Sequence, residues 1–134
     1  MSSILAIASS GMMAASLRLN VSASNVANSQ SSGPLPDATG PGAKAAAAYT
    51  PLRVDQVDIG GATSATATAV SPSYAPSYAP RAPYADQSGM VASPNVDLTN
   101  ETVQQITAQY AFAANAKVTQ VASQMAGALL DMTA

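Results

Sequence analysis

Apolar residues recur at steps of three and four across the C-terminal third of the chain. They are Val103, Ile106, Tyr110, Ala114, Val118, Val121, Met125, Ala128 and Met132. This spacing places the side chains on one face of an α-helix. Asp97 would cap that helix by accepting from unpaired backbone N–H groups, and Glu101 would lie in the first turn, where the helix dipole favours an anion. We predict a helix from Leu98 to Met132, roughly 50 Å long.

The same rhythm occurs near the N-terminus. Its positions are Leu5, Ala8, Met12, Ala15, Leu19, Ala23 and Val26. We expect this first helix to end near Asn28, because the following stretch to Gly42 is rich in the turn-forming residues Ser, Gly and Pro. A helix of more than about 25 residues with a narrow apolar stripe needs a partner. We therefore predict a mainly α protein whose long terminal helices, in 1–30 and 96–134, pair in a coiled-coil-like manner around a middle region, 31–95.

The middle region has weak patterning, so either an irregular arm or a small β domain fits it. Strands are predicted at Tyr49–Val54 and Val57–Ile59, closed by Gly60 and Gly61, with a weak edge strand at Thr66–Val70. The run from Gly40 to Lys44 lacks the spacing of a phosphate-binding loop, and we interpret it as a turn.

A Ser-Tyr-Ala-Pro unit is duplicated at the start of the segment Ser73–Tyr84. Proline fixes φ and removes a donor, so we expect this segment to be extended or polyproline-like. It would either bind an aromatic groove of a partner domain or lie along neighbouring subunits with its tyrosines buried.

Composition limits the classes of function. The 134 residues are 48% hydrophobic, but alanine dominates, with one Phe and no Trp, so large apolar side chains are scarce and the monomer is expected to be marginally stable. Five basic and seven acidic residues are scattered, which disfavours nucleic acid as a partner. The chain has no Cys or His, so no disulfide, thiolate nucleophile or common zinc site is expected. Serines interrupt the apolar N-terminal segment, which disfavours both a membrane span and a cleaved signal peptide.

Three residues of the first helix carry open alternatives. Gly11 inside a helix is better explained by close approach of a neighbouring helix than by a ligand. On one interpretation Asn25 is solvated and Asn28 ends the helix. On the other, both amides hydrogen-bond to neighbouring subunits and fix the register of packed helices, as buried Asn does in coiled coils.

Two groups of residues resemble a known family. The N-terminal group is Ser10-Gly11-Met12, Ala15, Arg18-Leu19-Asn20-Val21, Ala23 and Asn25-Val26-Ala27-Asn28. This pattern resembles the axial proteins of the bacterial flagellum, which comprise rod, hook and hook-junction proteins. The second group contains Tyr78, Pro80, Pro83, Ala85, Gly89, Val91, Pro94-Asn95-Val96-Asp97 and Glu101, continued in the helix by Phe112, Ala114, Asn115 and Val118. This run resembles the proximal rod members of that family.

The resemblance implies a structural subunit of the basal-body rod, exported without cleavage, whose terminal helices assemble into a tube that transmits torque and encloses the export channel. It implies copies of itself, other rod proteins, the MS ring and the export gate as partners. Residues expected at the assembly interface are Met12, Arg18, Leu19, Asn25, Val26, Asn28, Asp97, Ile106, Phe112, Asn115, Val118, Val121 and Met125.

We predict that Met12, Leu19 and Val26 pack against Ile106, Val121 and Met125, within one subunit or between subunits. The alternative function is a secreted adaptor that binds a partner through the Tyr/Pro-rich arm. An enzyme is the poorest hypothesis, because no convergent group of catalytic side chains is visible. No cofactor, metal or small-molecule substrate is expected.

Overall fold

The computed structural model describes residues 2–36 and 46–132, so the predicted turn at Gly40–Lys44 lies outside the described residues. The elements are α1 (Ser2–Ala27), β1 (Leu52–Ile59), β2 (Ala62–Ala69), β3 (Tyr74–Tyr78), β4 (Met90–Pro94) and α2 (Leu98–Asp131). Two long helices thus flank, in the sequence, a middle region that contains a small amount of antiparallel β structure. A small β region was one of the two alternatives predicted from the sequence.

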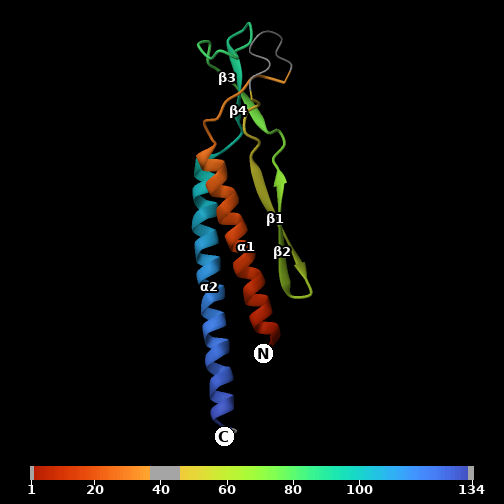
Figure 1. Cartoon of the computed structure of the whole chain (residues 1–134), viewed down its shortest axis with the longest axis vertical. Coiled ribbons are helices and arrows are strands. Elements are labelled where there is room, and N and C mark those ends of the chain that lie inside the picture. Colours follow the sequence, from red (N-terminus) through yellow and green to blue (C-terminus); the bar gives the residue numbers. More distant parts are fainter. Residues whose placement is uncertain (1, 37–45, 133–134) are drawn as a thin grey trace.

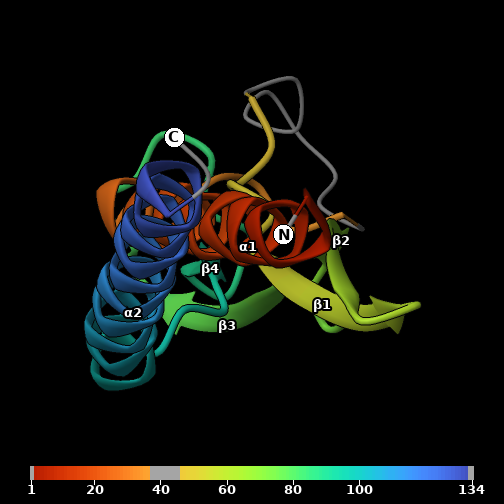
Figure 2. The same cartoon turned by 90° about the horizontal axis from the view of Figure 1, so that it is seen from below.

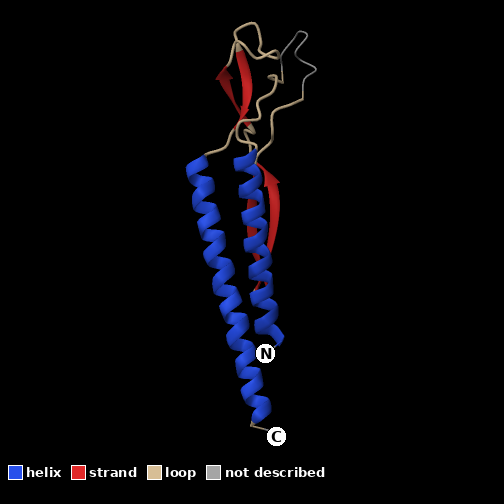
Figure 3. Ribbon diagram, turned by 60° about the vertical axis from the view of Figure 1, so that its left-hand side comes forward, coloured by secondary structure: helices blue, strands red, loops and turns tan. Residues whose placement is uncertain are grey.

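The helices lie side by side and run in opposite directions, so that both chain ends are at the same end of the molecule (Figure 1). α1 has 26 residues and α2 has 34, and α2 extends past the beginning of α1 (Figure 3). The predicted ends of α2 and the end of α1 near Asn28 are confirmed to within one residue. Asp97 caps α2, where its Oδ1 accepts from the backbone N–H groups of Thr99 and Asn100 at 2.9 and 3.2 Å.

α1 lies between α2 and the β1–β2 hairpin (Figures 1 and 2). β1 is one continuous strand, whereas two shorter strands were expected, and β2 begins at Ala62, four residues before the predicted Thr66. The turn joins Ile59 to Ala62 through Gly60 and Gly61, whose φ values are +62° and +88°. Two successive positive φ values define the tight turn that matches strand twist, which glycine adopts without a Cβ penalty.

The second hairpin-like pair, β3 and β4, lies at the end of the molecule opposite the chain termini (Figure 1). β3 takes up part of the duplicated Ser-Tyr-Ala-Pro segment, so the predicted extended conformation is confirmed. Pro76 faces Ala92, whose own N–H and C=O bond instead to Gly33 on the other side of β4. Ala92 therefore needs no donor from Pro76, and the proline fits the strand without loss of a ladder hydrogen bond.

Small and polar side chains make the contact between the helices. The most buried residues of the two helices are Ala8, Ala14, Ala15, Val21, Ser22, Asn25, Ala108 and Ala122. Of the predicted N-terminal stripe only Ala8 and Ala15 are buried, and most of the large side chains in both stripes are exposed. The periodicity was correct, but packing of these large residues against one another within one subunit was wrong, because the helices approach through their small residues.

By length and composition alone, the helix over Ser3–Ala27 is apolar enough to cross a membrane, although serines interrupt its apolar runs. Alanine raises its mean hydropathy. In the structure, however, α1 packs against α2 on one side and the hairpin on the other, and it buries the polar residues Ser22 and Asn25 against them.

Candidate assembly surfaces

Asn25 joins three parts of the molecule. Its side chain is 1% exposed, and its Nδ2 donates to the carbonyl oxygen of Leu52 and to Oε1 of Glu101, both at 2.7 Å. Its Oδ1 accepts from the N–H of Leu52 and from the hydroxyl of Tyr49, both at 3.0 Å. An asparagine amide has two donors and room for two acceptor contacts, so its capacity is used entirely within the chain.

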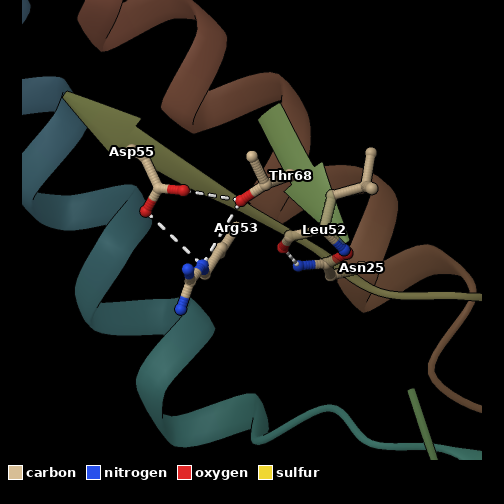
Figure 4. Close-up of polar contacts among 5 residues, drawn as sticks. All are labelled: Asn25, Leu52, Arg53, Asp55 and Thr68. Atoms are coloured by element: carbon tan, nitrogen blue, oxygen red, sulfur yellow. Dashed lines mark hydrogen bonds and ion pairs between the residues drawn. The ribbon is translucent and has the colours of Figure 1, made fainter. Parts of the chain in front are cut away.

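The pairing with Leu52 copies the backbone geometry of a strand. One amide donates to the carbonyl and accepts from the N–H of the same residue, as an adjacent antiparallel strand would (Figure 4). The interpretation of Asn25 as solvated is therefore wrong. The hydrogen bonds that the other interpretation assigned to neighbouring subunits are, for Asn25, made inside the chain.

Two further residues of this junction had no clear signal in the sequence. Ser22 is 1% exposed and donates to the carbonyl oxygen of Glu101 at 2.9 Å. The Tyr49 hydroxyl also shares a 3.1 Å hydrogen bond with Ser24. Ser22 and Asn25 are three residues apart and therefore lie on the same face of α1, which is the only sequence feature that could have grouped them.

Gly11 and Asn115 mark the closest approach of the two helices. A Cβ built on Gly11 would lie 2.7 Å from both terminal atoms of the Asn115 side chain, closer than real contacts allow. Asn115 is held there by a 2.8 Å hydrogen bond from its Nδ2 to the carbonyl of Ala111. The structural explanation of Gly11, close approach of a neighbouring helix, is confirmed.

Most of the predicted interface residues face away from this contact. The apolar ones with more than a third of their surface exposed are Leu19, Val26, Ile106, Phe112, Val118, Val121 and Met125. Single hydrophobic residues scattered over a surface are normal, but seven large ones on two helices are more than that. Larger exposed apolar patches are typical of interaction sites. We call these seven residues the outward apolar set.

Part of this set borders an open apolar hollow of about 460 Å³ between the beginning of α1 and the second half of α2. Its lining includes Ile4 from α1 and Val118, Val121 and Met125 from α2. Its lining residues come only from α1 and α2 among the described elements.

Three other residues predicted for the assembly interface are Arg18, Asn28 and Met12. Arg18 lines a hollow of about 320 Å³ together with Arg53 and Glu101, and it makes no ion pair within the described residues. Asn28, directly after the end of α1, donates to the carbonyl of Ser24 at 2.9 Å, and Met12 is half-buried. None of these contacts tests the assembly role, which stays a prediction for all thirteen residues.

The Tyr/Pro-rich segment is paired rather than free. β3 is hydrogen-bonded to β4, and Tyr84 shares a 2.7 Å hydrogen bond with Ser32, while Tyr78 is 71% exposed. An adaptor of the predicted kind would dock on an aromatic groove through a preformed polyproline II segment, whereas this segment is a β-strand. Pairing with β4 occupies one edge of this segment, while the side chains of Ala75 to Tyr78 stay exposed.

Acidic side chains elsewhere have structural partners. Asp55 accepts from the Thr68 hydroxyl at 2.6 Å and pairs with Arg53 at 3.4 Å (Figure 4). Asp58 accepts from the N–H of Gly61 at 3.0 Å and so supports the hairpin turn. Among residues 2–36 and 46–132, no group of three or more Asp and Glu side chains is arranged to hold a metal ion.

Comparison with known proteins places this architecture in a class. Residues 5–34 match the family described as flagella basal body rod protein, and residues 87–132 match the C-terminal family of flagellar basal body rod FlgEFG proteins. The two matches cover α1 and α2, so the helical part of the fold is that of a flagellar rod protein.

Curated relatives narrow the assignment. The chain is 36% identical over 125 residues to the flagellar basal-body rod protein FlgC of Yersinia enterocolitica, covering 86% of this chain and 84% of that protein. It is 38% identical over 126 residues to FlgC of Salmonella typhimurium, covering 91% and 90%. FlgC of Escherichia coli O6:H1 is 36% identical over 132 residues, with the same shares. The chain therefore belongs to the FlgC family of flagellar basal-body rod proteins.

Proposed function

We propose that this protein is a structural subunit of the flagellar basal-body rod that assembles through the outward apolar set of its two helices. The observation that supports this most directly is that small and large side chains of α1 and α2 lie in different places. Small residues make the contact inside the subunit, and the seven side chains of the outward apolar set are among the large apolar side chains that remain exposed. Burying such side chains in contacts between subunits would stabilise an assembly by roughly 25 cal/mol per Å².

In this proposal the axial part comprises residues 1–30 and 96–134, with coiled-coil-like pairing of the helices, and the middle region 31–95 lies on its outside. Heterologous contacts that do not close produce open helical assemblies, which suits a tube. The tube would transmit torque and enclose the export channel. The subunit would reach it by flagellar export without a cleaved signal peptide.

The proposed partners are copies of this chain and other rod proteins, with the MS ring and the export gate suggested by the family resemblance. We propose neither nucleic acid nor a small-molecule substrate as a partner, and the proposed role of the protein is structural rather than enzymatic. The hollow beside Ile4 and Val118 is the place where a neighbouring helix would enter.

The experiment complements a clean deletion of the gene and examines swimming together with isolated basal bodies by electron microscopy. The test variant is Ile106→Ser with Val121→Ser, because these side chains are 49% and 43% exposed and contribute little to the subunit's own core. The matched control is Gln109→Ser with Gln124→Ser, two exposed polar positions on the same helix.

We expect wild type and control to restore rods and swimming, and the test variant to restore neither while circular dichroism of the purified subunit is unchanged. Rods assembled normally by the Ile106→Ser, Val121→Ser variant would refute a role for the outward apolar set. Rods in the uncomplemented deletion strain would refute the function itself.

A further inference from the structure

The β1–β2 hairpin has two outer edges, and the register shows which backbone groups point outward. The N–H of Val70 donates to the carbonyl of Pro51 at 2.9 Å, so the next pair, Leu52 with Ala69, is not hydrogen-bonded across the hairpin. Alternation then directs the N–H and C=O groups of every second residue outward. These residues are Leu52, Val54, Gln56 and Asp58 on β1 and Thr63, Ala65, Ala67 and Ala69 on β2.

Two contacts with α1 confirm this direction. Both backbone groups of Leu52 bond to the Asn25 amide, and the N–H of Thr63 donates to the Ser10 hydroxyl at 3.0 Å. α1 therefore provides hydrogen-bond partners for the backbone at the beginning of β1 and at the beginning of β2. These two places lie on opposite edges of the hairpin. Within the described part of the chain, the outward backbone groups from Val54 onward on β1 and from Ala65 onward on β2 have no hydrogen-bond partner.

The free edge of β2 lacks the usual protection against pairing with another strand. Natural edges are blunted by proline, charge, bulges or a covering element. The stretch Ala65–Ala69 contains only Ala and Thr, pairs with β1 in unbroken register, and carries no charge. The other pair of strands is different, because Pro76 has its backbone nitrogen on the outer edge of β3 and Gly33 covers Ala92 on β4.

β1 offers a matching edge on the same molecule. The free stretches Val54–Asp58 and Ala65–Ala69 have the same length, and each presents donors and acceptors at every second residue. The charged side chains of β1 do not cover its edge, since Arg53 and Asp55 bond to each other and to Thr68 (Figure 4). Asp58 bonds to the turn.

We propose that the β2 edge at Ala65–Ala69 pairs with the β1 edge at Val54–Asp58 of a second copy of this chain. The resulting order, β1-β2 of one copy followed by β1-β2 of the next, is antiparallel throughout. The contact is heterologous, and each copy keeps one edge free for a further copy. The proposal rests on the proposed function and adds to it a second, backbone-mediated contact between copies, separate from the outward apolar set.

The first experiment uses the absence of cysteine from the chain. Subunits carrying Thr66→Cys and subunits carrying Val57→Cys with a tag that increases their mass are co-expressed in the deletion strain, and basal bodies are treated with a short thiol-to-thiol cross-linker. In the antiparallel pairing, Thr66 of one copy lies beside or one register step from Val57 of the next.

We expect covalent dimers of mixed mass only. Dimers of Thr66→Cys subunits alone would mean two-fold pairing of β2 with β2. A product with another rod protein would mean a different partner, and no product would mean no edge pairing. Each of these three results would overturn the proposal.

The second experiment blocks the edge without breaking the hairpin. The N–H of Ala67 points outward, so Ala67→Pro removes a donor for a neighbouring strand and no hydrogen bond to β1. Ala67→Thr keeps the donor and is the matched control. We expect Ala67→Pro to lose the mixed dimer when both cysteine subunits carry it, while its circular dichroism spectrum matches that of Ala67→Thr.

Unchanged cross-linking of the Ala67→Pro subunits would overturn the backbone pairing. Failure of this inference is distinguishable from failure of the proposed function. Rods built from cysteine subunits that never cross-link would leave the rod role intact, whereas absence of the wild-type subunit from isolated basal bodies would remove both.

Discussion

Asn25 of α1 donates to Glu101 of α2 at 2.7 Å, and the same nitrogen donates to Leu52 at the start of β1. One buried amide thus connects the two helices and the first strand. Buried polar groups are costly when unpaired, and here every donor and acceptor of the amide has a partner. The junction therefore makes docking of the hairpin dependent on correct pairing of the helices.

Replacing Asn25 should destabilise the subunit strongly. Asn25→Ala leaves the N–H and C=O of Leu52 and the carboxylate of Glu101 without their partner in a buried place, and we expect a loss of about 3 kcal/mol in the free energy of unfolding. Urea denaturation followed by circular dichroism measures it. Asn25→Ala with a midpoint equal to that of wild type would show that the junction contributes nothing.

The Asp variant separates charge from shape. Asn25→Asp has nearly the same volume but turns the donor that faces Glu101 and Leu52 into an acceptor, so we expect destabilisation at neutral pH. Adding Glu101→Gln restores a donor opposite the new carboxylate and should recover part of the loss. Equal denaturation midpoints for Asn25→Asp with and without Glu101→Gln would contradict the contact between these residues.

Tyr49 contributes hydrogen bonds to the junction through its hydroxyl. Tyr49→Phe removes the hydrogen bonds to Asn25 and Ser24 and keeps the ring, while Asn25 still accepts from Leu52. We expect a loss of about 1 kcal/mol. Tyr110→Phe is the control, because that side chain is 73% exposed on α2, and its denaturation midpoint should not move. A Tyr49→Phe midpoint that matches the control would contradict a role for the hydroxyl.

Much of this fold could be predicted from the sequence, because helix periodicity, capping by Asp97 and the Gly60-Gly61 turn act through neighbouring residues. Which face of each helix points toward the other helix could not be predicted in this way. Hydrophobicity alone suggests that Ile106 and Val121 face inward, but the tightest approach of two helices occurs where side chains are smallest, as at Ala8 and Ala108. The roles of Tyr49 and Leu52 were also beyond reach, because their partner Asn25 lies more than twenty residues away in the chain.

The cap of α2 allows a simple local test. Asp97→Ala leaves two N–H groups of the first turn without their acceptor, and we expect a loss of about 1 kcal/mol. Asp97→Asn keeps a side-chain oxygen at the same place and should lose only a few tenths of that, from weaker interaction with the helix dipole. Thermal denaturation distinguishes the two variants. Equal denaturation midpoints for Asp97→Ala and Asp97→Asn would mean that the cap does not stabilise the subunit.

Gly11 and Asn115 allow the helix contact itself to be measured. Within a helix, Ala is more stable than Gly by up to about 1 kcal/mol, so Gly11→Ala would stabilise α1 if space allowed. The new Cβ would instead meet the Asn115 side chain at 2.7 Å and displace it from its hydrogen bond with Ala111. We therefore expect little gain, or a loss, in the wild-type background.

Asn115→Ala removes the obstacle, so Gly11→Ala should be more stabilising in that background than in wild type. A double-mutant cycle gives the difference as an interaction energy, expected at about 1 kcal/mol, within the range found for residues in contact. Gly127→Ala is the control, because a Cβ at Gly127 meets nothing within 4 Å. Its effect should be the same with Asn115 or Ala at position 115. Equal effects of Gly11→Ala in the two backgrounds would mean that α1 and α2 do not approach at Gly11.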